Sequence, residues 1–308
     1  MNTNENNTPE PAPTPASAFA PALASINAIA EIFSSIVGKI VSLATQALSP
    51  ALIRQSCDGA RVIGNYAVLA SIVFTFINAL IYAVRFRTIY IFLAGVGIMI
   101  ALVIAHYAAG RFLAASDKII SGTPGRISST AFPDCVGLLL LLLAIGVFVG
   151  GIIEGKQESS IVPFILAIVI ALLLVLTAAI TLNPKSVGIE IGNASAGEEA
   201  IGLISFFLKT CLKLVSAQFC LLALAGCVLT IWGFFSPDMG ANASGFFRLL
   251  PFASVLSVVP PSMIGPGIVL YACLTPIFTY LFFLFGSLML DLARAILVLP
   301  EKLDSTRR

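Results

Sequence analysis

An uncharged apolar run of 23 residues, 62–84, constrains this chain more than any other feature of its sequence. At about 1.5 Å per residue, a helix of that length crosses the roughly 30 Å hydrocarbon core of a bilayer. A second apolar run, 88–109, follows after only Arg85, Phe86 and Arg87, so the two helices must form an antiparallel hairpin. The chain therefore folds in lipid and not around a core surrounded by water.

Four further apolar runs bring the number of predicted membrane spans to six: 136–153, 161–182, 214–235 and 268–290. Only 10% of the 308 residues are charged and 58% are hydrophobic, and a soluble chain of this length needs more charge to cover its surface. The sequence predicts an all-α integral membrane protein, with a six-span bundle over 62–299 and a short polar tail over 300–308.

The basic residues predict the orientation of the bundle. If the N-terminus is cytoplasmic, 13 of the 17 Lys and Arg residues fall on the cytoplasmic side, and the outer side holds only Arg85, Arg87, Lys156 and Arg248. Membrane proteins show this bias. Both termini are therefore predicted to be cytoplasmic. The first basic residue is Lys39, so 1–22 resembles neither a secretory signal nor a mitochondrial presequence, and the expected location is a bacterial inner membrane.

The first 61 residues precede the predicted bundle. Residues 1–22 are rich in Pro and Ala, which is typical of a disordered tail. From residue 23 to 48, apolar side chains recur at spacings of three and four, as at Ile29, Phe33 and Ile36, so an amphipathic helix is predicted. Glu31 and Lys39 argue against a span there. Pro50 is predicted to end this helix, giving an interfacial helix and linker over 23–61.

A second helix start is predicted after the fourth span. Ser195 and Glu198 have the spacing of a capping box, in which each residue's side chain accepts a hydrogen bond from the other's backbone N–H. A helix is therefore expected to begin near Ala196. Because neither Gly nor Pro interrupts the chain between Gly202 and Gly226, one long helix is favoured over a separate interfacial helix before the fifth span.

Residues that could carry out chemistry are few. The six cysteines form no CxxC pair and His106 is the single histidine, so no metal site and no cofactor is predicted. His106 is interpreted as an interfacial histidine. Ligation of a haem or quinone together with a partner subunit stays open. Spans 136–153 and 161–182 contain no ionisable or amide side chain, and Asp291 and Arg294 are interpreted as an interfacial pair. No catalytic residue is predicted.

Glycines in the third span are the predicted helix-packing residues. Gly146 and Gly150 form a GxxxG pattern that Gly151 extends. Small residues let helix backbones approach closely in lipid, where apolar attraction between helices gives little net gain. This packing could occur within the bundle or between subunits.

The stretch VVPPSMIGPGI, 258–268, allows two interpretations. Its defining residues are Pro260, Pro261, Gly265, Pro266 and Gly267. Prolines lack a backbone donor, and re-entrant segments with broken backbone normally line a polar cavity. The nearby polar side chains are only serines, so an outer surface turn is favoured over a re-entrant loop across 249–267.

These features predict a non-catalytic integral membrane subunit that anchors, scaffolds or assembles a larger membrane complex. Its expected partners are membrane lipids and either other membrane subunits or further copies of itself. The net charge of +2 is too small to indicate nucleic acid. The alternative is a channel or carrier for an uncharged or lipid-like solute, because such a function needs few charges within the membrane.

Overall fold

The structure, a computed structural model, describes residues 31, 35, 38–123, 125–157, 162–192, 195–235 and 261–306. The chain divides into two compact units, Met1–Ala47 and Leu48–Arg308. In the first unit, residues 38–47 are helical, and the Thr45 hydroxyl donates to the Val41 carbonyl at 2.8 Å. The tail predicted for 1–22 lies outside the described residues, and so does half of the amphipathic helix predicted over 23–48.

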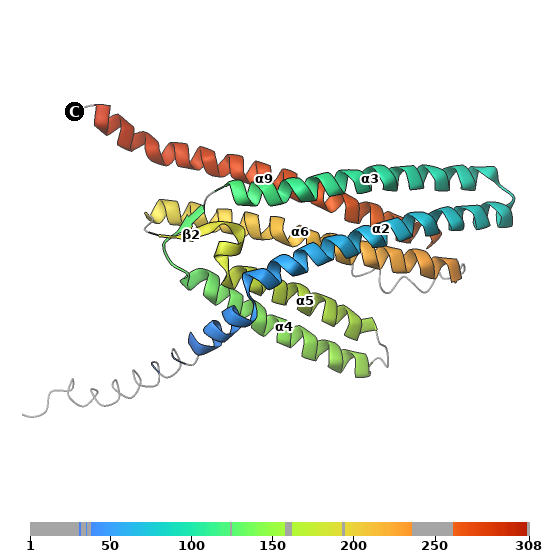
Figure 1. Cartoon of the computed structure of the whole chain (residues 1–308), viewed down its shortest axis with the longest axis horizontal. Helices are drawn as coiled ribbons and strands as arrows, with labels where there is room; N and C mark the ends of the chain where they lie inside the picture. Colours follow the sequence, from blue (N-terminus) through green and yellow to red (C-terminus); the bar gives the residue numbers. More distant parts are fainter. Residues whose placement is uncertain are drawn as a thin grey trace, which may run out of the picture. The chain divides into compact units, whose positions relative to one another are not determined.

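The second unit is built from long helices (Figure 1). Six of those in the described part are long and apolar enough to cross a membrane, and each overlaps one of the predicted spans. The prediction of an all-α multi-pass membrane protein is therefore confirmed. The helices are α2 (Pro50–Phe86), α3 (Ile89–Gly122), α4 (Ala131–Gln157), α5 (Val162–Leu182), α6 (Ala196–Phe235) and α9 (Pro261–Thr306).

Several helices extend beyond the predicted spans. The linker prediction for 50–61 is wrong, because α2 begins at Pro50: proline suits the first helical position, and the Ser49 side chain caps the helix by accepting from the Leu52 N–H at 3.4 Å. α9 continues through Pro300, so the short polar tail predicted over 300–308 is helical as far as residue 306. The residues after Pro300, including Glu301, Lys302 and Leu303, are strong helix formers.

The capping box before α6 is present as predicted. The Glu198 carboxylate accepts from the Ser195 N–H at 2.9 Å, and the Ser195 hydroxyl accepts from the Glu198 N–H at 3.4 Å. α6 then runs unbroken for 40 residues, which confirms the prediction of one long helix.

Two short strands, which the sequence analysis did not predict, join connecting segments at one end of the bundle. β1 (Gly125–Ile127) and β2 (Ile189–Ile191) pair in parallel. A 3₁₀ helix, η1 (Pro184–Val187), precedes β2, and Gly188 has a φ of 68°, which glycine adopts without strain. We call this the sheet end of the bundle: α3 and α5 end there, and α4 and α6 begin there (Figure 1).

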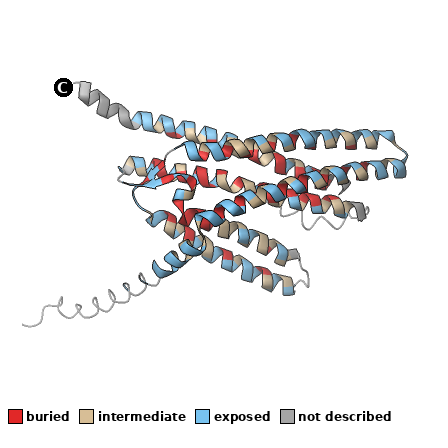
Figure 2. Cartoon of the chain, viewed as in Figure 1, coloured by how far each residue is buried: buried red, intermediate tan, exposed pale blue. Residues whose placement is uncertain are grey.

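Buried residues form two clusters, one at the sheet end and one deeper between α2, α3, α6 and α9. Figure 2 shows buried positions on the facing sides of these helices and exposed positions along their outer sides. The first cluster includes Ile127 and Ile189 from the strands, so β1 and β2 are part of the core. The arrangement places several polar side chains of α2, α3 and α6 between helices.

Candidate functional site

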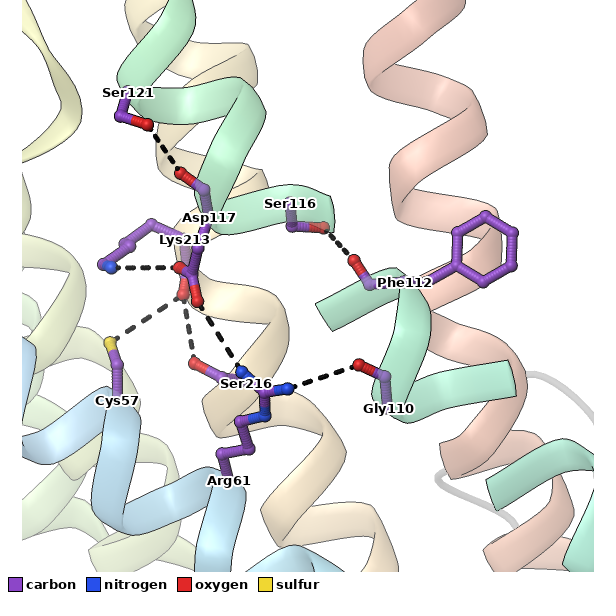
Figure 3. Close-up of polar contacts among 9 residues, drawn as sticks. All are labelled: Cys57, Arg61, Gly110, Phe112, Ser116, Asp117, Ser121, Lys213 and Ser216. Atoms are coloured by element: carbon purple, nitrogen blue, oxygen red, sulfur yellow. Dashed lines mark hydrogen bonds and ion pairs between the residues drawn. The ribbon is translucent and has the colours of Figure 1, made fainter. Parts of the chain in front are cut away.

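A three-helix ion cluster lies towards the sheet end and centres on Asp117 of α3 (Figure 3). Its Oδ1 lies 3.4 Å from the Nζ of Lys213 on α6, and its Oδ2 lies 3.8 Å from an Nη atom of Arg61 on α2. The Lys213 side chain is 17% exposed and that of Asp117 is 53% exposed. One carboxylate therefore connects two cations from two other helices, at the edge of the packed interior.

Neighbouring groups complete the cluster (Figure 3). Arg61 also donates to the carbonyl of Gly110 at 3.3 Å, so it contacts α3 at two points. The Ser216 hydroxyl donates to the Lys213 carbonyl at 3.3 Å, and the Cys57 thiol is 3.9 Å from the same oxygen. The Arg61 and Cys57 contacts link α2 to α3 and to α6, and the Ser216 contact lies within α6.

A second charged group, Lys209, is buried one turn earlier on α6. Its relative exposure is 0%, and its ammonium donates to the carbonyl oxygens of Thr123 and Gly188, the latter at 3.1 Å. Within the described residues, no carboxylate forms an ion pair with it. Lys209 therefore joins the end of α3 to the start of β2 through main-chain carbonyls.

A third polar cluster lies deep between α2 and α6. The hydroxyls of Ser71 and Thr230 are 3.2 Å apart, and the Asn78 amide donates to the Thr230 carbonyl at 3.1 Å. All three residues are buried. Because an unpaired polar group in lipid is costly, such contacts stabilise the pairing of the two helices. These contacts were not predicted from the sequence.

Together these clusters couple helices of the bundle. Their donors are taken up by carboxylates or by main-chain carbonyls of other elements. Among the described residues, no group of three His, Cys, Asp or Glu side chains lies close enough to hold a metal ion. The arrangement can fix the relative positions of α2, α3 and α6, and its ion pairs at the partly exposed edge respond to salt.

The three glycines predicted for helix packing divide into two groups. Gly151 lies against α5, where an added Cβ would be 3.3 Å from the Pro163 carbonyl oxygen and would overlap the Ala167 side chain. Gly146 and Gly150 have no atom within 4 Å of an added Cβ in the described part of the chain. Of the two alternatives, packing within the bundle or between subunits, Gly151 therefore follows the first.

The predicted turn at Pro261, Gly265, Pro266 and Gly267 is wrong, because these residues form the first turns of α9. Proline is favoured at a first helical position, and Gly265 lets α9 approach α6 closely. Pro260 and the rest of 249–260 lie outside the described residues, so the re-entrant alternative is untested there.

Other polar residues singled out in the sequence lie apart from these clusters. His106 is half-buried on α3, and its Nδ1 has no hydrogen-bond partner in the described part of the chain. The buried Oδ1 of Asn65 on α2 likewise has no hydrogen-bond partner among the described residues. Asp291 and Arg294 form the expected pair, at 3.3 Å on the exposed side of α9. A role for His106 with a partner subunit stays a prediction.

The ion cluster and Lys209 were missed because the sequence analysis treated their charges only as orientation signals. A usable signal was present: Lys209 shares the helical spacing of Phe206 and Leu212, which are both buried. A lysine on the apolar face of a helix must find acceptors inside the fold.

No protein-family model, curated protein or solved structure matches this chain.

Proposed function

We propose that this chain is a non-catalytic membrane subunit that anchors or assembles a larger complex in a bacterial inner membrane. The observation that carries the proposal is an exposed apolar stripe along α9, which we call the α9 seam. Its residues alternate at spacings of four and three, and all are exposed: Phe278, Phe282, Phe285, Met289, Leu292 and Ile296. This heptad spacing is typical of a helix that pairs with another helix.

The α9 seam is distinct from the face of α9 that packs within the chain. Phe283 and Leu290 belong to the buried cluster at the sheet end, and an added Cβ on Gly286 would overlap the Leu208 side chain of α6. α9 therefore has two apolar faces, of which the described part of the chain covers one. The other is available to lipid or to a partner helix.

Helix length favours a partner over lipid for the last part of the seam. The 46 residues of α9 extend about 69 Å, more than twice the roughly 30 Å hydrocarbon core. Leu292 and Ile296 follow the charged Asp291 and are 56% and 63% exposed. Burying such a side chain stabilises by about 1.5–3 kcal/mol. Contact with a helix of another subunit would bury these side chains and so stabilise the complex.

The open glycines of α4 provide a second surface of the same kind. Gly146 and Gly150 face outward beside exposed apolar residues such as Ile145 and Val149. Small residues four apart commonly support helix association in membranes. The polar residues inside the bundle support the proposal as well, since their contacts hold helices together.

Extraction in a mild detergent followed by native mass spectrometry tests the proposal. We expect the protein to carry a companion chain, or a further copy of itself, at constant stoichiometry. The competing function is a channel or carrier for an uncharged solute. A protein that is always extracted as a single chain, and that conducts such a solute after reconstitution into liposomes, would replace the proposal with this alternative.

A further inference from the structure

A groove between α3 and α9 has the features of a lipid-headgroup site. It encloses about 350 Å³ and is lined by Arg111, Phe112, Ala114, Ala115, Lys118 and Tyr280. Two of these residues are cations, two are small and two are aromatic. The groove lies outside the ion cluster of Asp117 and outside the α9 seam.

The basic residues of the groove share one face of α3. Arg111, Ala114, Ala115 and Lys118 follow the spacing of three, four and seven that aligns side chains on a helix. The two cations are thus about 10 Å apart along the helix axis, by the helical rise. The two alanines between them leave room for a ligand.

Within the described residues, neither cation of the groove is neutralised. Arg111 and Lys118 are both exposed, and neither forms an ion pair within the described residues. By contrast, Arg61 and Lys213, at the same end of the bundle, share the Asp117 carboxylate. The groove therefore has positive charge available for an anionic ligand.

Aromatic residues fix the wall of the groove and indicate its depth. The rings of Phe112 and Tyr280 meet edge to face, with centroids 5.2 Å apart at 72°. Tyr107, which is exposed and one turn before Arg111, lies on the same face of α3. Tyrosines are enriched at the membrane–water interface. Arg111 also follows directly after the apolar run 88–109, so the groove lies at headgroup depth.

We propose that this groove binds the phosphate headgroup of an anionic membrane lipid. Arg111 and Lys118 would contact the phosphate oxygens, and Phe112 and Tyr280 would contact the glycerol and upper acyl region. Basic pockets between membrane helices on the cytoplasmic side are a known setting for anionic lipids. The inference requires the membrane location but not the proposed role in assembly.

The test compares lipid binding by native mass spectrometry with phosphatidylglycerol and with phosphatidylcholine. The variant R111Q/K118Q should bind phosphatidylglycerol roughly tenfold to thirtyfold more weakly, because each basic residue near an anionic surface contributes about 1 kcal/mol. The control R54Q/K185Q removes two other exposed cations and should bind like the unmodified protein. An equal loss in the control, or no loss in R111Q/K118Q, would overturn the proposal.

A second variant separates a shaped site from general attraction of charge. A114L/A115L keeps both cations and fills the groove, so it should also lose phosphatidylglycerol binding while its unfolding temperature in phosphatidylcholine nanodiscs stays within a few degrees. Unchanged lipid binding by this variant would contradict the proposal. Inorganic phosphate should not compete at millimolar concentration. Competition by phosphate alone would assign the groove to a free anion and would overturn the lipid assignment.

Discussion

Gly265 of α9 lies directly against the backbone of Thr230 on α6. A Cβ added to Gly265 would be 2.5 Å from the Thr230 nitrogen and 2.7 Å from its Cα. Gly226 of α6 completes the crossing, since its added Cβ would be 3.0 Å from the Gly265 carbonyl oxygen. The same Thr230 holds α2 through Ser71 and Asn78. This crossing therefore joins α2, α6 and α9.

The substitution G265A should destabilise the bundle by about 1–3 kcal/mol, because the new methyl group meets backbone that has little freedom to move. Gly267 provides a matched control, because its added Cβ has no described atom within 4 Å. Thermal unfolding in nanodiscs checks the pair. A G265A protein as stable as G267A would show that the two helices are not in close contact there.

The substitution K209M should destabilise the sheet end, because it removes the ammonium donor of the Thr123 carbonyl and leaves the Gly188 carbonyl with only the Gly125 N–H. An unsatisfied buried polar group costs about 1–3 kcal/mol. Hydrogen exchange should become faster at the amides of Gly125 and Gly192, which donate to the carbonyls of Gly188, just before β2, and of Ile127 in β1. The exposed Lys185 supplies the control K185M, which should leave both exchange rates unchanged.

The substitution D117N should have a smaller, salt-dependent effect. It removes the ion pairs with Arg61 and Lys213, and partly exposed pairs contribute about 0.2–1 kcal/mol each. The difference in unfolding free energy from the unmodified protein should shrink at 1 M salt, because the ions screen these interactions. D291N breaks a pair within α9 alone and should cost less. A D117N defect that is independent of salt would argue against an electrostatic link between the helices.

Hydropathy predicted the six membrane helices because a bilayer imposes a minimum length on an apolar run. It did not predict where the helices end, because α2 and α3 continue past the apolar runs, where caps and tertiary contacts stabilise them. The three-residue strands were not predicted either. They pair across about sixty residues of sequence, and neither is long enough to show a period of two.

The helix contacts were predicted only in part. Gly151 packs as expected, but another close crossing uses Gly226 and Gly265, which are 39 residues apart and share no motif. The stretch around Gly265 resembled a turn because its prolines and glycine disfavour helix in isolation. Packing against Thr230 overrides that preference, and no pattern within one helix indicates a contact with another.

Topology is tested by cysteine labelling in a background that lacks the exposed Cys135 and Cys211. A membrane-impermeant thiol reagent added outside the cell should label Q157C, between the third and fourth spans. It should not label S121C, because the sheet end is predicted to be cytoplasmic. After the membrane is permeabilised, S121C should react. Labelling of S121C in intact cells would reverse the predicted orientation.

Photo-crosslinking at Ile296 in native membranes tests the proposed subunit contact most directly. Ile296 lies on the α9 seam, and Arg294 lies at nearly the same level on a different face of α9. A photoreactive residue at 296 should give one discrete heavier product of constant mass, and the same residue at 294 should give little or none. If position 296 reacts only with lipid and the protein keeps its single-chain mass, the α9 seam faces the bilayer and the assembly function is contradicted.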